Sequence, residues 1–198
     1  MRILVTAFDP FGGEVMNPAQ MAVERLADRI GNHDITKLIV PTVFGVSGDQ
    51  VTAEMDRLKP DAVISVGQAG GRKAVTPERV AIDIMDANIT DNAGIQPKDE
   101  PVVEGGPAAY FSTLPVKTMV ESIKAAGLPA QISNTAGTFV CNHLLYRVLH
   151  HAAQRMPHTK CCFVHVPYIT EQVREKPDMP SMELEDIVRA LTAAIEGL

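Results

Sequence analysis

The sequence predicts an α/β fold in which helices cover both faces of a twisted, largely parallel sheet, giving a three-layer sandwich. Short apolar segments alternate along the chain with segments whose apolar residues recur at helical spacing. Such alternation is typical of parallel strands joined by crossover helices. The length of 198 residues allows a sizeable core, so we expect a single domain over residues 1–198.

The first half of the chain predicts four strands and two helices. The apolar run Arg2–Phe8 reads as a buried strand. Asn17 before Pro18 predicts the start of a helix, because Asn is a good N-cap and Pro suits the first helical position. Apolar spacing carries this helix to Ile30, and Gly31 ends it. The further elements are a strand over 35–43, a helix over 47–58, a strand over 61–66 and a strand over 80–85.

The second half begins with an irregular region. Residues 86–109 carry several glycines, prolines and acidic residues, which predicts a long excursion with a short hairpin. Ligands of parallel sheets bind beyond the carboxyl ends of the strands, so we expect the site in the loops that follow strands. The remaining elements are a helix over 115–126, a short strand over 130–133, a helix over 139–151, the strand Lys160–Val166 and an amphipathic helix over 181–195.

Composition and charge exclude several classes of protein. The chain is 45% hydrophobic and 21% charged, as globular proteins are, and its net charge of -6 offers nucleic acid no basic surface. Its apolar runs are too short for a membrane span or a signal peptide. Three cysteines, two of them adjacent, do not form a disulfide framework. We therefore expect a cytoplasmic protein that binds neither nucleic acid nor membranes.

Cys141 is the candidate nucleophile. It follows the Gly/Ser/Thr-rich turn 133–140 and stands at the start of a predicted helix. Because the positive end of a helix favours thiolate, we expect its pKa to be lowered, and the free N–H groups there could hold an oxyanion. Neither Cys141 with His143 nor the pair Cys161 and Cys162 has the spacing of a zinc site. Packing is the only role we assign to that pair.

His165 is the candidate base, because it lies near the carboxyl end of a predicted buried strand. Two interpretations stay open here: a base for Cys141, or a core histidine bonded to a backbone carbonyl. His143 is two positions from Cys141 on a helix and therefore points to another side. The other histidines lie in polar segments and are expected at the surface: His33, His150, His151 and His158.

Glu78 is a candidate for the third group that orients the imidazole of a Cys–His pair. The alternative is a surface salt bridge with Arg79. The glycine-rich segments 11–13 and 67–72 could approach a phosphate, but they match neither a dinucleotide fingerprint nor a P-loop. Phe8 and Phe11 bracket the first loop, where two aromatic rings could enclose a flat ligand or only close the end of the sheet.

Four motifs, in order along the chain, resemble the signatures of the pyroglutamyl peptidase I (pyrrolidone-carboxylate peptidase) family. They are Thr-Ala-Phe-Asp-Pro-Phe-Gly-Gly over 6–13 with Asn17-Pro18, Gly-Gln-Ala-Gly-Gly-Arg over 67–72 with Glu78-Arg79, Ser-Asn-Thr-Ala-Gly-Thr-Phe-Val-Cys-Asn-His over 133–143, and His-Val-Pro-Tyr over 165–168. Four ordered motifs over nearly the whole chain make the resemblance specific.

The resemblance implies a phosphorylase/hydrolase-like sandwich and a cysteine peptidase that removes N-terminal pyroglutamate (5-oxoproline) from peptides, with no cofactor or metal. By position it makes Cys141 the nucleophile, His165 the general base and Glu78 the orienting group. It also implies a homotetramer. The family's substrate pocket corresponds to Phe8, Phe11, Asn17, Thr42, Gln68, Ile89, Phe139 and Val140.

The sequence departs from the family pattern at Asn88 and Thr90, where members often carry arginine and proline, and at Ala7, where glycine is common. Two alternatives to the peptidase therefore stay open. One is an inactive homologue that binds pyroglutamyl groups without cleaving them, and the other is a phosphate-using enzyme of the phosphorylase type. Because Cys141, His165 and Glu78 are all present, we expect activity.

Overall fold

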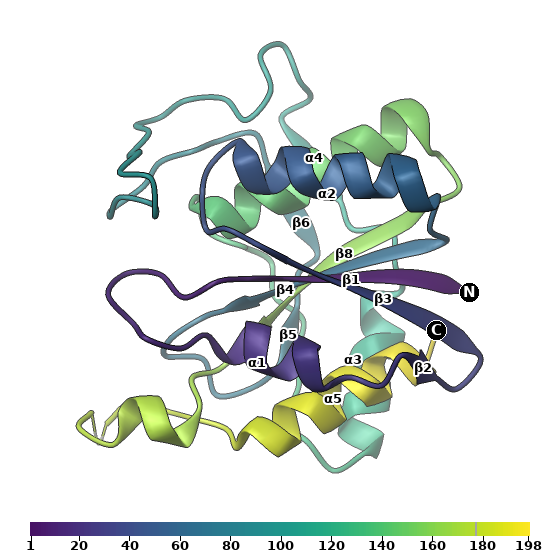
Figure 1. The fold of residues 1–198 in the computed structure, drawn as a ribbon, viewed down its shortest axis with the longest axis vertical. Helices are drawn as coiled ribbons and strands as arrows, with labels where there is room; N and C mark the ends of the chain where they lie inside the picture. Colours follow the sequence, from purple (N-terminus) through teal and green to yellow (C-terminus); the bar gives the residue numbers. More distant parts are fainter. Residues whose placement is uncertain (177) are drawn as a thin grey trace.

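A six-stranded sheet lies at the centre of the computed structural model, which describes residues 1–176 and 178–198 (Figure 1). Four strands are parallel, and a short antiparallel strand closes each edge. In sheet order the strands are β2 (Arg29–Ile30), β3 (His33–Val40), β1 (Arg2–Phe8), β4 (Ala62–Gln68), β8 (Lys160–Val166) and β5 (Thr76–Pro77). The predicted α/β fold with a largely parallel sheet is confirmed.

Five helices complete the sandwich. Figure 1 shows α2 and α4 over one face of the sheet and α1, α3 and α5 over the other. Side chains alternate along β1 and so contribute to a hydrophobic core on each face of the sheet. Ile3 and Val5 pack with α1, α3 and α5, whereas Leu4 and Phe8 pack with α2 and α4. The bounds are α1 Pro18–Arg25, α2 Val46–Leu58, α3 Val116–Ala125, α4 Val140–Arg155 and α5 Leu184–Glu196.

Several predicted boundaries were wrong. Helix α1 ends at Arg25 rather than Ile30, because Leu26 adopts an extended ψ of 144° and Ile30 joins β2. The expected strand at 130–133 is reduced to isolated bridges from Ala130 to Val75 and from Ser133 to Glu78. Helix α4 runs about one turn beyond the predicted residue 151. Strands β2 and β5 and the 3₁₀ helix Thr170–Val173 were not predicted.

The irregular region predicted over 86–109 lies between the two strands of a hairpin, rather than containing a hairpin of its own. Strands β6 (Val80–Ile82) and β7 (Ala109–Phe111) form a separate antiparallel pair, and the chain between them extends on the side of α2 and α4 (Figure 1). Asn142 anchors β6: its Oδ1 accepts from Ile82 N–H (3.0 Å), and its Nδ2 donates to the carbonyls of Ile82 (2.9 Å) and Ile84 (3.0 Å). The excursion is thus fixed to α4 next to Cys141.

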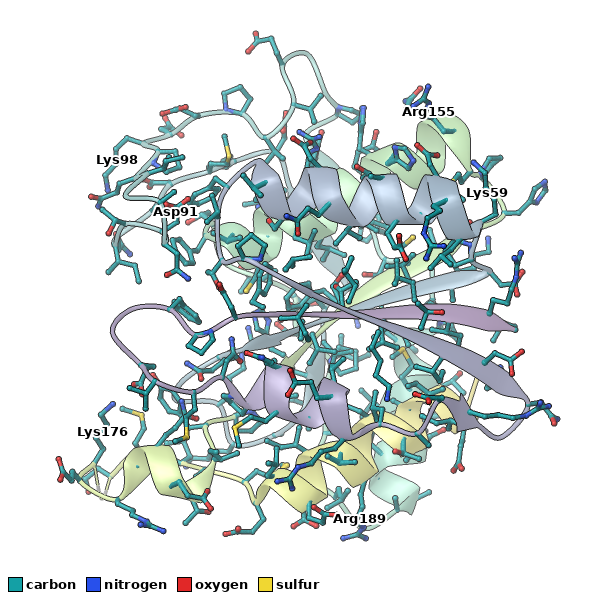
Figure 2. All side chains as sticks on the ribbon, in the orientation of Figure 1. Lys59, Asp91, Lys98, Arg155, Lys176 and Arg189 are labelled. Carbon is teal, nitrogen blue, oxygen red and sulfur yellow. The ribbon has the colours of Figure 1, made fainter. Side chains whose placement is uncertain are left out.

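The two ends of the parallel strands lie at opposite edges of the molecule. In Figure 2, Asp91 and Lys176 mark the edge where the strands end, and Lys59 and Arg155 mark the edge where they begin. Within the described residues, no helix is both long and apolar enough to cross a membrane.

Candidate active site

Cys141 is half-buried at the second position of α4, after the extended N-cap residue Phe139. The first N–H groups of a helix have no intrahelical partner, so those of Val140, Cys141 and Asn142 are free of helix bonds at the turn that carries the thiol. The thiol reaches the sheet at Gly67 of β4. A Cβ atom at Gly67 would lie 3.0 Å from Cys141 Sγ and 2.7 Å from the ring of Phe163, so glycine is required for this approach.

His165 comes to the same point from the neighbouring strand. In the register of β4 and β8 it is paired with Gly67, and it shares its face of the sheet with Phe163, whose ring lies at the same glycine as the thiol. The side chain is buried, with its ring centroid 4.8 Å from that of Phe163. Its Nδ1 lies 2.7 Å from Glu78 Oε1. The alternative of a core histidine bonded to a backbone carbonyl is therefore wrong.

Glu78 is fully buried immediately after β5. Its N–H donates to the carbonyl of Phe163 (2.8 Å), which fixes the backbone against β8. Its Oε1 accepts from both His165 and Arg72, the latter through Nη1 at 2.7 Å. The alternative of a surface salt bridge with Arg79 is wrong, because the carboxylate is buried and its cation is Arg72.

The expectation of a lowered Cys141 pKa is reversed. The pKa of this thiol is raised to about 12, mainly by burial and also by the negative charge of Glu78, against the opposing charge of Arg72. Burial also lowers the pKa of His165, against an opposing hydrogen bond from Glu78. At Cys141 the loss of hydration raises the pKa by more than the positive end of the helix lowers it. Both shifts favour the uncharged forms, a thiol at Cys141 and a neutral imidazole at His165.

A cavity of about 460 Å³ lies at the edge where the strands end and begins at Gln68, the last residue of β4; its lining does not include Cys141 or His165. Three of the predicted pocket residues line it, namely Phe11, Gln68 and Ile89. Phe139 stands behind them, with its ring centroid 6.0 Å from that of Phe11. The further lining residues are Gly12, Glu14, Gly70, Gly71, Tyr168 and Met179.

The other predicted pocket residues support the site from behind. Phe8 and Val140 belong to the core that also contains α2. Asn17 caps α1 through Oδ1 (2.9 Å to Ala19 N) and donates from Nδ2 to the carbonyl of Asp9 (3.0 Å). Thr42 binds Asp9 through its backbone N–H and its hydroxyl. Asn17 and Thr42 thus hold the loop that carries Phe11, and the structure does not bring them to the cavity.

Arg72, which bonds to Glu78, was not among the predicted site residues, although its motif was noted. The only sequence signal was an arginine directly after two glycines at the carboxyl end of a strand, and that signal names no partner. Of the histidines expected at the surface, His158 is exposed, whereas His33, His150 and His151 are half-buried. Within the described residues, no cluster of three His, Cys, Asp or Glu side chains is arranged to hold a metal ion.

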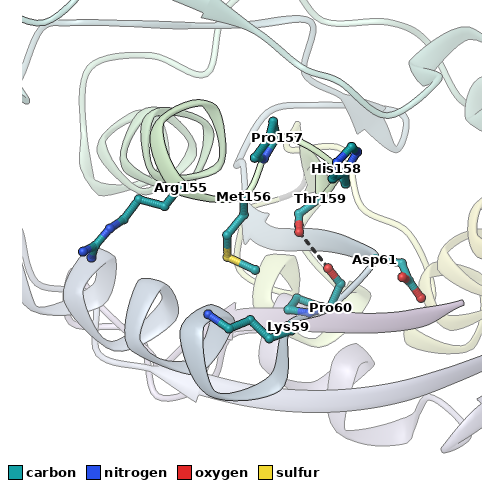
Figure 3. Close-up of a pocket in the computed structure, with 8 residues that line it drawn as sticks. All are labelled: Lys59, Pro60, Asp61, Arg155, Met156, Pro157, His158 and Thr159. Atoms are coloured by element: carbon teal, nitrogen blue, oxygen red, sulfur yellow. Dashed lines mark hydrogen bonds between the residues drawn. The ribbon is translucent and has the colours of Figure 1, made fainter.

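A second cavity of about 360 Å³ lies at the opposite edge, between the ends of α2 and α4 (Figure 3). Two of its polar side chains are already engaged: Thr159 donates its hydroxyl to the carbonyl of Pro60 (2.8 Å), and Asp61 accepts from Arg2 N–H (2.7 Å). It holds no nucleophile beside a base. It lies where the strands begin, away from the edge at which α/β sheets bind ligands.

Comparisons with known proteins identify the family of this chain. The model of the family described as pyroglutamyl peptidase matches residues 1–198. The pyrrolidone-carboxylate peptidase of Staphylococcus haemolyticus is 57% identical, over 100% of this chain and 93% of the relative. The crystal structure of pyroglutamyl peptidase I from Bacillus amyloliquefaciens is 48% identical, with a TM-score of 0.96 over 99% of this chain and 95% of that one. A mutant pyrrolidone carboxyl peptidase from Pyrococcus furiosus is 41% identical, with a TM-score of 0.95 over 100% and 97%.

Proposed function

The chain belongs to the pyroglutamyl peptidase family, and on that premise we propose that Cys141, His165 and Glu78 carry out its reaction. The reaction is hydrolysis of the bond after an N-terminal pyroglutamyl residue, by a cysteine peptidase. One observation carries the assignment: the thiol lies at Gly67, the strand position paired with His165, and the imidazole is bonded to a buried carboxylate at 2.7 Å.

The first step is proton transfer from Cys141 Sγ to His165 Nε2. Glu78 accepts from the Nδ1–H of His165, which leaves Nε2 without a proton and able to receive one. The sulfur then attacks the carbonyl carbon that links pyroglutamate to the next residue. The imidazolium formed in this step is stabilised by Glu78, as in other triads.

The tetrahedral oxyanion accepts hydrogen bonds from N–H groups of the first turn of α4, which have no partner within the helix. His165 Nε2–H then gives its proton to the leaving nitrogen, the C–N bond breaks, and a thioester remains on Cys141. Water loses a proton to His165 and attacks the thioester. Pyroglutamate leaves as the free acid, and the thiol is restored.

The cavity accounts for the choice of pyroglutamate. Its lactam ring is flat and uncharged, so the ring of Phe11 and the polar end of Gln68 suit its faces and its amide edge. An ordinary N-terminal ammonium would lose hydration there without gaining a counter-ion. Glu14, which also lines the cavity, is already paired with Lys176 at 3.2 Å.

Release of a fluorescent amine from a pyroglutamyl amide tests the proposal. The parent protein should release it, the prolyl analogue should be inert, and Cys141→Ala should lose about 10³-fold or more in kcat. Cys161→Ala is the matched control and should retain kcat, because that cysteine is buried in the core away from Gly67.

Three results would contradict the proposal. Turnover by Cys141→Ala at the parent rate would show that Cys141 is not the nucleophile. Binding of pyroglutamyl amide without cleavage would favour the inactive homologue. Cleavage that requires phosphate would favour the phosphorylase-type alternative, which the geometry disfavours because Arg72 is already engaged by Glu78 and by the carbonyl of Thr135.

We further infer assembly as a homotetramer in the cytoplasm, as the family resemblance implies. The free state of all three cysteines suits a reducing compartment. Phe111 on β7 is 70% exposed, which suits a surface covered by another copy. Light scattering during size-exclusion chromatography measures the assembly, and a monomeric mass at micromolar concentration would contradict the tetramer.

A further inference from the structure

Arg72 connects the proposed triad to the loop that carries the nucleophile. The residue is half-buried in the turn after β4. Its Nη1 donates to Glu78 Oε1 (2.7 Å), the same oxygen that accepts from His165, and also to the hydroxyl of Thr76. Its Nη2 donates to the carbonyl of Thr135 (3.1 Å), in the turn before α4. One guanidinium thus bonds to Glu78, to β5 and to the cysteine loop.

The positive charge of Arg72 compensates the buried negative charge of Glu78. A carboxylate with no exposure to solvent is costly unless a cation and hydrogen bonds compensate it. His165 cannot supply that cation in the resting state, because burial lowers its pKa. Glu78 Oε2 is buried without a hydrogen-bond partner among the described residues, so the whole compensation falls on Oε1.

The planar shape of the Arg72 guanidinium also fixes the positions of its acceptors relative to one another. The planar fork of a guanidinium fixes the relative positions of two acceptors, which an ammonium on a flexible stem does not. Here the two branches reach Glu78 and Thr135, which come from segments that are not adjacent in sequence. Thr76 adds a third connection, because its hydroxyl also lies 3.4 Å from the carbonyl of His165. Arg72 therefore couples the orientation of the imidazole to the position of the cysteine loop.

We propose that Arg72 is a positioning residue of the reaction: it is the countercharge of Glu78 and it locks the His165–Glu78 pair to the loop that presents Cys141. It need not touch the substrate. This inference rests on the proposed function, since it gives Arg72 a task only if Glu78 orients His165.

Kinetics of three variants test this role. Arg72→Met removes both charge and fork, Arg72→Lys restores charge alone, and Lys73→Met removes a neighbouring exposed charge as the matched control. Arg72→Met should lower kcat for a pyroglutamyl amide by more than about tenfold with a smaller change in KM. Arg72→Lys should recover only part of kcat, and Lys73→Met should keep the parent value.

A double-mutant cycle tests whether Arg72 acts through Glu78. In a Glu78→Gln background, Arg72→Met should cost less than about threefold further in kcat, because the group it positions is already lost. A full tenfold loss in that background, or a rise in KM at unchanged kcat, would overturn the proposal. Circular dichroism of each variant confirms that the comparison is made between folded proteins.

NMR titration of His165 gives a readout that does not require turnover. The positive charge of Arg72 helps to hold the pKa of His165 down, so Arg72→Met should raise that pKa, whereas Lys73→Met should not. An unchanged His165 titration in folded Arg72→Met would overturn the role of Arg72. If Arg72→Met raises the pKa of His165 but the parent protein does not cleave pyroglutamyl amides, the effect of Arg72 on His165 stands and the proposed function is refuted.

Discussion

At the residue scale, the site consists of side chains whose burial changes their chemistry. Cys141 stands at a helix start, the setting that usually favours thiolate, yet its pKa rises to about 12 because desolvation dominates. His165 shifts in the opposite direction for the same reason. The two shifts together favour the uncharged forms, which is why the proposed mechanism needs His165 as the base that makes the thiolate.

The pH dependence of the reaction follows from the His165 shift. The imidazole serves as base only when neutral, and burial lowers its pKa below the ordinary value of about 6.5. As pH rises, kcat/KM for a pyroglutamyl amide should therefore reach half its maximum below pH 6.5. It should show no second rise between pH 7 and 9, because the thiol does not titrate there. A half-maximum above pH 7 would contradict this assignment.

The chemistry-bearing residues could be predicted from the sequence, but their partners could not. Cys141 was identified by its turn and helix, whereas His165 and Glu78 each kept two interpretations until the family resemblance was considered. Their bond joins residues 87 apart in sequence, and Arg72 reaches Thr135 across 63. No local pattern encodes such separations, which is why Arg72 was missed.

At the element scale, long elements with clear periodicity were predicted well and very short ones were not. The bounds of β1 and β8 agree residue for residue with the prediction. Strands β2 and β5 have two residues each, too few to show any alternation. Yet β5 carries the chain into Glu78, so the part of the sheet that positions the orienting carboxylate was the part that sequence patterns could not predict.

The pairing of β4 with β8 requires glycine at position 67. A methyl group there would lie 2.7 Å from the ring of Phe163, which is fully buried, and 3.0 Å from Cys141 Sγ. Gly67→Ala should therefore displace the thiol, lowering kcat by about 10²-fold, and overpacking should cost about 1–3 kcal/mol in the free energy of unfolding. Amide hydrolysis and urea unfolding measure the two effects.

Gly127→Ala is the matched control for this substitution. Gly127 follows α3 with a φ of +80°, and its Cβ would meet no atom within 4 Å. The control should lose stability through backbone strain, about 1 kcal/mol, while retaining kcat. Parent activity in Gly67→Ala, or an equal loss of kcat in both variants, would show that Gly67 does not control the position of Cys141.

At the scale of the whole molecule, the site forms where segments from both halves of the chain meet at one edge of the sheet. The loop after β1, the turn after β4, the segment after β5 and the start of α4 all border it. Predicting a parallel sheet was enough to predict this edge. The cavity itself depends on which loop side chains face inward. Of the residues predicted for the substrate pocket, Phe11, Gln68 and Ile89 line the cavity, whereas Asn17 and Thr42 hold the loop that carries Phe11.

The packing of α2 against α4 makes the stability of the whole molecule sensitive to acid. His143 of α4 is buried there, with Nε2 accepting from Gly45 N–H (3.3 Å) and Nδ1 without a partner among the described residues. Its pKa is lowered to about 4, mainly by burial and also by the charge of Arg147, against the opposing charge of Asp49. In the unfolded chain the same group titrates near 6.5. As pH falls from about 6.5 to about 4, His143 therefore binds a proton in the unfolded state but not in the folded state, and the free energy of unfolding falls.

His143→Gln should remove much of this dependence while keeping an acceptor for Gly45 N–H. Each pKa unit corresponds to about 1.4 kcal/mol, so the buried imidazole accounts for at most about 3 kcal/mol across that window. His165 acts in the same direction, because its pKa is also lowered, so the variant should keep a reduced slope rather than none. Urea unfolding at several pH values measures it, with His158→Gln as the exposed control that should keep the parent slope. An unchanged slope in His143→Gln would mean that the imidazole is protonated within the folded protein, and that the contact of α2 with α4 accommodates the charge.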